Sequence, residues 1–389
     1  MDAVTVATFL AAGLASLFMA WAIGAGSSGS TPFAPAVGAN AVSVMRAGFV
    51  VGIFGLLGAT LQGANVTEAV GRELVVGDPL TPVAAIVALS IAAALVAVGV
   101  FTGYPIATAF TVTGAVIGAG LAMGGAPAWP KWLEILAVWG LTPFVGGGVA
   151  YATAWLLRHE AVAEVLAIPA LAALVGAILA NVEFVLLGGG GEAASVSAAI
   201  AGGSGYPGRA AVTLLVAATI GGALAADMRA DEAAGERHFL LVMGALVAFS
   251  AGGSQVGLAL GPLLPLLEGA GVALPLVALL FGGGVGLLLG SWTAAPRMIK
   301  AIAQDYSSLG PRRSIAALIP SFAIAQVAIL LGVPISFNEI VVSAVVGAGA
   351  AGAAGVSAGK IGYTVLAWVA SLVGAGVLSY VLYLGIVVV

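Results

Sequence analysis

The sequence predicts an all-α polytopic membrane protein with about ten to twelve hydrophobic helices in two inverted repeats that contain broken helices. Three observations lead to this prediction. The 389 residues are 61% hydrophobic and 7% charged, whereas soluble domains carry about 25% charged residues. About twelve apolar runs approach the roughly 20 residues that a membrane-spanning helix needs. A sequence pattern in the first half also recurs in the second half.

The apolar runs are separated by short polar breaks, and no stretch is long enough for a separate soluble domain. A membrane β-barrel is not expected, because the runs lack the alternating pattern of its strands. We expect some runs to be half-helices rather than full crossings. In chain order, the runs lie at about residues 4–24, 44–63, 83–102, 105–122, 132–157, 163–187, 210–226, 239–260, 271–293, 314–332, 335–352 and 361–388.

Composition also excludes several functions. The chain has no cysteine, so it has no disulfide and no thiolate nucleophile. The net charge of −4 and the lack of basic clusters argue against a nucleic-acid partner. No nucleophile–base–acid set and no cluster of metal ligands is apparent, so we expect neither an enzyme nor a bound cofactor.

The repeat has a constant offset. Gly-Tyr-Pro-Ile at 103–106 recurs as Gly-Val-Pro-Ile at 332–335, and the same offset of 229 residues pairs Trp139 with Trp368. Chance similarity in a chain rich in Ala, Gly and Val is the alternative, but composition alone rarely gives a gapless offset that also matches Pro and Trp. Repeats with interrupted helices at corresponding places are typical of secondary transporters.

The repeat defines the expected organisation of the chain. We expect a first transporter repeat at residues 1–157, connecting helices and loops at 158–238, and a second repeat at 239–389. Seven apolar segments precede the second repeat, and an odd number would invert it in the membrane. The basic stretch 297–313 is expected in the cytoplasm by the positive-inside rule.

Two glycine-rich and serine-rich motifs are candidates for anion binding. Residues 24–32 follow the first apolar run, and residues 250–255 repeat their chemistry in the second half. Glycine lets the backbone leave helical geometry, and hydroxyls with free amides at a helix terminus suit an anion. A simple surface loop is the alternative for the first motif.

Two helix starts supply further candidates, because residues 105–109 and 334–339 each open a helix after Gly-x-Pro. Proline suits the first helical turn, where backbone amides lack partners. An ordinary helix start at the membrane surface is the alternative. Across the four motifs, the candidate substrate-binding residues are Ser27, Ser28, Ser30, Thr108, Ser254, Gln255, Ser336 and Asn338.

Glu339 is the candidate coupling residue. A charged carboxylate at the centre of a bilayer costs at least ~2.5–3.5 kcal/mol, so such residues usually serve function. A position at the membrane surface is the alternative. The repeat mate of Glu339 is Phe110, so the chemistry of the two halves differs. Gly146–Gly148 and Gly282–Gly284 are expected at close contacts between helices.

These motifs resemble those of the inorganic phosphate transporter (PiT) family of membrane anion permeases, over about residues 4–157 and 239–388. The family's tandem motif reads roughly Gly-Ala-Asn-Asp-Val-Ala-Asn-x-x-Gly-Pro-x-Val-Gly, once in each half. The family's Pro-Val-Ser-Thr-Thr-His helix start is similar to residues 105–110 and 334–339. The matches to the tandem motif are Gly24-Ala25 and Pro35-Ala36-Val37-Gly38 in the first half, and Gly252, Val256 and Gly261-Pro262-Leu263 in the second.

The sequence departs from the family at the residues that the resemblance associates with ions. The family's Asn-Asp pair is Gly26-Ser27 in the first half and Ser254-Gln255 in the second, and its histidines are Phe110 and Glu339. The resemblance implies that the family's Asp and Asn residues serve sodium and that the hydroxyl tract serves phosphate. We therefore expect the fold to carry over, and sodium coupling and phosphate selectivity to be open.

The expected function is secondary transport of inorganic phosphate by alternating access, in a multi-pass protein of the cell membrane. The alternatives are a permease for sulfate or another oxyanion, a transport-inactive paralogue and a passive anion channel. Sodium or a proton is the candidate co-transported ion, and the missing Asp residues favour a proton carried by Glu339. The expected partners are phosphate or a similar oxyanion and the lipid bilayer, and a homodimer is left open.

Overall fold

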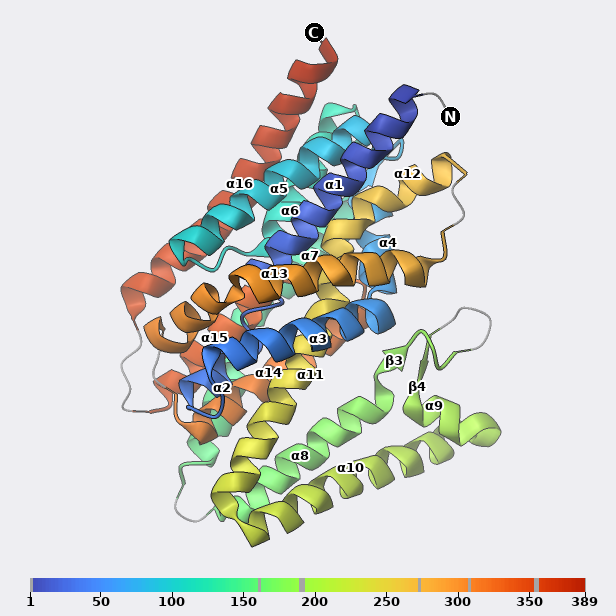
Figure 1. Ribbon diagram of the computed structural model, residues 1–389. Helices are drawn as coiled ribbons and strands as arrows, with labels where there is room; N and C mark the ends of the chain where they lie inside the picture. Colours follow the sequence, from blue (N-terminus) through green and yellow to red (C-terminus); the bar gives the residue numbers. More distant parts are fainter. Residues whose placement is uncertain are drawn as a thin grey trace.

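The protein is almost entirely helical in its computed structural model, which describes residues 3–159, 162–188, 193–271, 274–306, 309–352 and 357–388 (Figure 1). Within these residues, ten segments are long and apolar enough to cross a membrane, and two shorter apolar helices accompany them. The predicted class, a multi-pass helical membrane protein, is confirmed.

The helices follow the predicted apolar runs closely. In the first half they are α1 (Ala3–Gly26), α2 (Ala34–Gly38), α3 (Val44–Gln62), α4 (Ala64–Arg72), α5 (Pro82–Thr102), α6 (Thr108–Ala122) and α7 (Trp129–Leu156). Next come α8 (Glu164–Asn181), α9 (Val196–Ala201), the 3₁₀ turn η1 (Gly202–Ser204) and α10 (Gly205–Ala230). The rest are α11 (Glu232–Leu260), the 3₁₀ turn η2 (Gly261–Leu263), α12 (Leu264–Gly269), α13 (Leu276–Asp305), α14 (Pro311–Leu330), α15 (Phe337–Ala350) and α16 (Ala358–Val388).

Each of the twelve predicted runs forms a helix, but two features differ from expectation. Two short antiparallel pairs occur, β1 (Val75–Val76) with β2 (Ala126–Pro127) and β3 (Glu183–Phe184) with β4 (Ala194–Ser195). The basic stretch 297–313, expected as a polar connection, is mostly helical, because α13 continues through it to Asp305. Hydropathy reports where a helix leaves the apolar region and not where its hydrogen bonds end.

The two short helices begin where their repeats break. Gly103 ends α5 with φ of 77°, and its mate Gly332 follows α14 with φ of 61°. Glycine adopts this left-handed conformation at helix ends without steric cost. An extended segment with Pro105 or Pro334 then leads to a new helix start, so α6 and α15 begin inside the protein. They are the half-helices that the sequence predicts.

Corresponding helices of the two repeats make corresponding contacts, each with a helix of the other repeat. Helix α6 packs on α16, and its mate α15 packs on α7, which is the mate of α16. A Cβ atom added to Gly118 would lie 2.0 Å from the carbonyl oxygen of Gly376, and one added to Gly347 would lie 2.0 Å from that of Gly147. Gly347 is the repeat mate of Gly118, and Gly376 is the repeat mate of Gly147, so the two contacts are equivalent by the 229-residue offset. Such reciprocity is a property of an approximate two-fold axis. The close contact expected at Gly146–Gly148 is found at Gly146 and Gly147, whereas Gly148 meets no atom within 4 Å.

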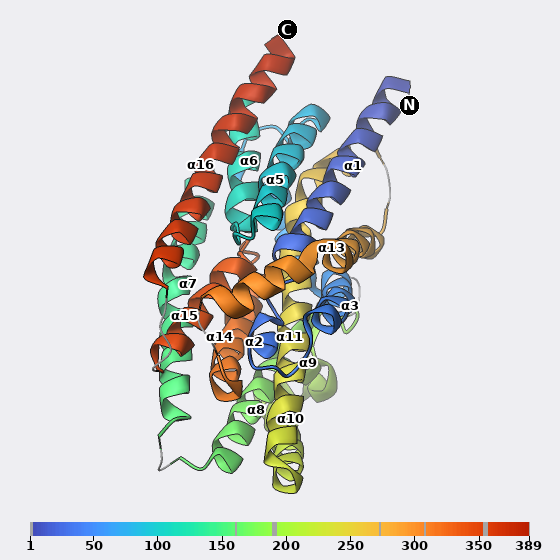
Figure 2. The ribbon, with the colours of Figure 1, turned by 60° about the vertical axis from the view of Figure 1, so that its left-hand side comes forward.

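The mates also run in opposite directions. Figures 1 and 2 show α1 descending from the N-terminus while α11 rises from the α10 corner to α12. Helices α1 and α11 each pack on the other repeat, α1 on α13 and α11 on α3. The second repeat is therefore inverted relative to the first.

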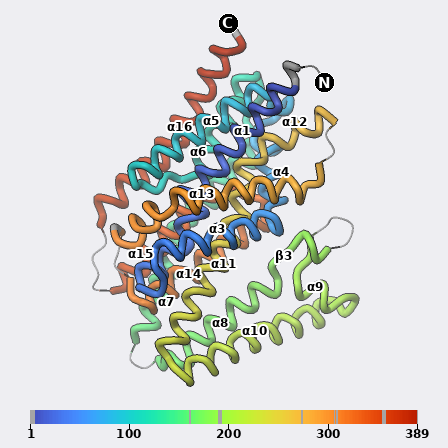
Figure 3. Tube along the Cα trace, in the orientation of Figure 1, coloured from blue at the N-terminus to red at the C-terminus, as the bar shows by residue number. Residues whose placement is uncertain are grey.

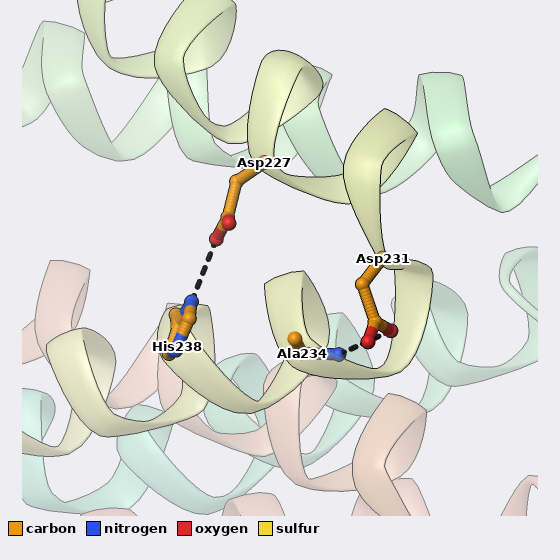
Figure 4. Close-up of polar contacts among 4 residues, drawn as sticks. All are labelled: Asp227, Asp231, Ala234 and His238. Carbon is orange, nitrogen blue, oxygen red and sulfur yellow. Dashed lines mark hydrogen bonds and ion pairs between the residues drawn. The ribbon is translucent and has the colours of Figure 1, made fainter.

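The connecting helices form a separate layer beside the repeats. Helices α8 and α10 pack on each other, with α9 at their far end, as the tube in Figure 3 shows. At the corner between α10 and α11, the backbone N–H of Ala234 donates to Asp231 Oδ1 at 3.1 Å, which caps α11. Nearby, His238 Nδ1 lies 2.8 Å from Asp227 Oδ2 (Figure 4). The polar break in the sequence is thus a helix corner.

Candidate anion-binding site

The nine predicted site residues gather in the interior, where α1 ends and where α6 and α15 begin beside α11. All nine are buried, with no more than 1% of each exposed. They include no Lys or Arg. The helix starts and Glu339 therefore lie inside the protein rather than on its exterior.

The two glycine- and serine-rich motifs reach this place in different ways. In the first repeat, α1 ends at Gly26, and the hydroxyls of Ser30 and Thr31 donate to the carbonyl of Ser27 at 3.1 and 3.0 Å. Hydroxyls that bond to the backbone locally favour irregular structure. In the second repeat, Ser254 and Gln255 lie within α11, which continues to Leu260. The motif at 250–255 is therefore part of a continuous helix, which gives way to the 3₁₀ turn η2 only at Gly261.

Thr108 joins the two repeats in the first turn of α6. Its hydroxyl accepts a hydrogen bond from Gln255 Nε2 at 2.8 Å and donates to Ser27 Oγ at 3.4 Å. Residues from the end of α1, from the start of α6 and from the C-terminal part of α11 are therefore in one continuous contact.

Asn338 makes a second link between the repeats. Its Nδ2 donates to the backbone carbonyls of Gly26, at 2.9 Å, and of Ile106, at 2.6 Å. Gln255 Nε2 likewise donates to the carbonyl of Ile335, which is the repeat mate of Ile106, at 3.3 Å. Because carbonyls surround the two amide nitrogens, both side chains turn their amide oxygens elsewhere.

Unpartnered polar atoms concentrate in this group. Among the described residues, ten buried side-chain atoms lack a hydrogen-bond partner, and six of them belong to the predicted site: Ser28 Oγ, Ser254 Oγ, Gln255 Oε1, Ser336 Oγ, Asn338 Oδ1 and Glu339 Oε2. Each such atom costs about 1–3 kcal/mol when nothing satisfies it. A cluster of this size calls for a polar partner, such as a ligand, an ion or ordered water.

The helix starts add backbone donors to this group. Ala107 and Ser336 precede α6 and α15, and neither caps its helix with a side-chain hydrogen bond. The N–H groups of a first helical turn lack intrahelical partners and carry the positive end of the helix dipole. They are suited to binding an oxyanion.

Two tryptophans, whose role the sequence reasoning did not identify, hold these helix starts in place. Trp139 Nε1 donates to the carbonyl of Pro334 at 2.8 Å, and Trp368 Nε1 donates to that of Pro105 at 2.7 Å. Each tryptophan therefore fixes the helix start of the other repeat. The signal was present in the sequence, because both residues of each contact share the 229-residue offset.

The two helix starts differ at one position. Glu339 stands in the first turn of α15, where a carboxylate interacts favourably with the helix dipole. Its mate Phe110 instead stacks on Trp139, with ring centroids 3.8 Å apart. One repeat thus offers an acidic group to the interior, and the other offers an aromatic ring.

The sequence matches the model of the phosphate transporter family over residues 6–379. The chain belongs to this family. It is 28% identical to a Chlamydia pneumoniae protein named "Putative phosphate permease", over 95% of this chain and 96% of the relative. It is 25% identical to "Inorganic phosphate transporter 2-1, chloroplastic" of Arabidopsis thaliana, over 93% of this chain and 69% of the relative.

A solved structure titled "The sodium-dependent phosphate transporter" has the same fold. Its TM-score is 0.81 at 22% sequence identity, and the match covers 98% of this chain and 100% of that chain. The family expected from the sequence is confirmed, and it is a family of membrane transporters. The roles of individual site residues stay predictions.

Proposed function

We propose that this protein carries inorganic phosphate across the cell membrane by alternating access and binds it between the inverted repeats. The carrying observation is the cluster of six unpartnered polar atoms at the junction of the repeats in a member of the phosphate transporter family. The site is buried, so phosphate reaches it only when the repeats move. Residues 1–157 and 239–389 are the moving units of this proposal, and residues 158–238 connect them.

The hydroxyls of Ser28, Ser254 and Ser336 are the proposed phosphate ligands, together with the free backbone N–H groups at the starts of α6 and α15. A hydroxyl can donate or accept, so it matches both the P–O⁻ and the P–OH groups of phosphate. Neutral donors bind an anion more weakly than an arginine that makes two charge-assisted hydrogen bonds to it. Such a site favours release after each crossing.

Gln255 and Asn338 have a different role in this proposal, because they present acceptor oxygens to the interior. Together with Glu339 they offer three oxygens without partners. Oxygen ligands suit hard cations, so these three residues are the proposed site of the co-transported cation. Sodium is the first candidate, since the matched solved structure is titled sodium-dependent. If a proton is the co-transported ion instead, Glu339 alone carries it.

Coupling to a cation is needed for accumulation. Moving one negative charge inward against about 100 mV costs roughly 2.3 kcal/mol, and a divalent anion costs twice that. A bound cation offsets this cost and adds its own gradient. Glu339 is the coupling residue for either ion.

Uptake into proteoliposomes tests the function. Labelled phosphate, sulfate and other oxyanions are each offered with a sodium gradient, with a pH gradient and with neither. Saturable phosphate uptake that a cation gradient increases is expected. Unsaturable conductance would identify a channel, and folded protein without flux would identify an inactive paralogue. A preference for sulfate would reassign the substrate.

A further inference from the structure

A second polar cluster lies at the end of α3, outside the proposed phosphate site. Gln62 and Gln326 come from different repeats, and their side-chain amides hydrogen-bond to each other in both directions, each at 3.3 Å. Gln326 Nε2 also donates to Ser250 Oγ at 2.6 Å. Gln62 Nε2 donates to the backbone carbonyl of Glu183 in the connecting layer at 3.0 Å. Three regions of the chain therefore meet at one pair of amides.

A cavity of about 450 Å³ adjoins this pair. It lies between α3 and α4 of the first repeat, α14 of the second repeat, and α8 and α10 of the connecting layer. The wall is mainly apolar, and its polar residues are Gln62, Asn65, Asn181, Glu183, Thr213 and Gln326. The space is ample for an inorganic oxyanion that retains part of its hydration shell.

The glutamine pair also touches the helix that carries half of the proposed phosphate site. Ser250, the partner of Gln326, precedes Ser254 by one turn of α11. A Cβ atom added to Gly253 would lie 2.8 Å from Cβ of Gln62, so Gln62 packs against Gly253, the residue before Ser254 in α11. The glutamine pair therefore lines the cavity and also contacts the segment of α11 that leads to Ser254.

The two glutamines are held differently. The connecting layer ties the end of α3 with two bonds, one from Gln62 to Glu183 and one from the N–H of Val185 to the carbonyl of Leu61 at 3.1 Å. Gln326 is bonded through its side chain to Gln62 and Ser250 alone among the described residues. A shift of α14 against the first repeat would part the amides and leave Gln62 in place.

We propose that Gln62 and Gln326 form a gate between this cavity and the phosphate site. The proposal rests on the proposed transport function. When the amides pair, they close the path with side chains of both repeats. When they part, their N–H groups become donors for an oxyanion that passes between them. The gate contains no ionised side chain, so it slows the anion without trapping it.

The chain has no cysteine, so the gate can be tested by cross-linking on the natural background. The double variant Gln62→Cys/Gln326→Cys is treated with a short bifunctional methanethiosulfonate in proteoliposomes, and phosphate uptake is measured. We expect uptake to fall about tenfold or more and to return after reduction. Each single variant, treated alike, is the matched control and should change less than about twofold.

Cross-linking that mass spectrometry verifies, without loss of uptake, would overturn the gate. Wild-type protein without any uptake would instead overturn the proposed function.

The variant Gln62→Leu/Gln326→Leu supplies a second test, because it closes the path with apolar side chains but leaves the phosphate site intact. We expect its maximal uptake rate to fall about tenfold while phosphate binding in detergent changes less than about twofold. Thr213→Val, on the α10 wall of the cavity, should leave both quantities unchanged, and an unchanged rate in the leucine variant would overturn the gate.

Discussion

The first repeat brings a broken helix to the proposed phosphate site, and the second repeat brings a continuous one. Helix α1 ends at Gly26, whereas α11 runs through Ser254 and Gln255 to Leu260. The scaffolds around them are nevertheless reciprocal, down to the glycines at which helices cross. Symmetric packing and asymmetric polar chemistry therefore coexist in one fold.

This difference separates the role of the helix packing from the role of the polar side chains. Packing between repeat mates must work equally well in both directions if the halves exchange roles during transport. The polar residues face no such demand, because in the proposed transport the phosphate and its cation each need a single set of ligands. Phe110 and Glu339 show this division, since the same position holds an aromatic ring in one repeat and an acid in the other.

The largest expected effect follows from removing that acid. Glu339→Gln should abolish gradient-driven accumulation and leave phosphate exchange largely intact, because the amide keeps the shape but carries neither proton nor charge. At about 100 mV the loss corresponds to roughly 50-fold in accumulation for one coupled charge. Uptake and counterflow in the same proteoliposomes measure both quantities.

Phe110→Leu is the matched control for the acid, because it changes the mate position without altering charge. It should retain coupled accumulation. Accumulation that survives Glu339→Gln unchanged would remove Glu339 from the coupling mechanism. Loss of proton-driven but not of sodium-driven uptake would assign Glu339 to protons alone.

The next effect concerns the symmetry of the scaffold. Gly118→Ala and Gly347→Ala each place a methyl group against a backbone carbonyl of the partner helix, so each should destabilise the protein by about 1–3 kcal/mol. Thermal unfolding in detergent measures the loss, and the two losses should be similar. Gly140→Ala on α7 meets no atom within 4 Å and should not destabilise. A large loss at one mate only would break the reciprocity.

A smaller effect is expected at the tryptophans that hold the helix starts. Trp139→Phe and Trp368→Phe each remove one hydrogen bond, worth about 0.5–1.5 kcal/mol. Both should weaken phosphate binding, because the helix starts lose their fixed position. Trp292, whose Nε1 donates to the carbonyl of Phe49, supplies the control: Trp292→Phe should affect stability but leave the phosphate affinity unchanged. If all three variants weakened phosphate binding equally, Trp139 and Trp368 would have no specific role in positioning the helix starts.

Much of the fold could be predicted from the sequence, because membrane helices are long apolar runs and the 229-residue offset matches Pro, Gly and Trp. The short elements were missed: α4 and the strand pairs lack the length for a hydropathy signal. The extension of α13 to Asp305 was missed as well, because a polar helix and a polar loop have similar composition.

The candidate site was predictable as a set of residues but not as a geometry. The sequence placed Gln255 and Asn338 among donors for an anion. Their orientation depends on the carbonyls of Ile106 and Ile335, which belong to segments far away in the chain. The partnership of Gln62 with Gln326 joins positions that are not repeat mates, so the offset that revealed the tryptophan contacts gives no indication of it.

The serines test the central claim, that phosphate binds between the repeats on hydroxyls without other partners. Saturable phosphate uptake is measured for the wild type, for Ser254→Ala/Ser336→Ala and for Ser43→Ala at the exposed start of α3. The account predicts about a tenfold or greater rise in the half-saturating phosphate concentration for the double variant, from two lost hydrogen bonds to a charged ligand, and no change for Ser43→Ala. An unchanged half-saturating concentration in the folded double variant would contradict it.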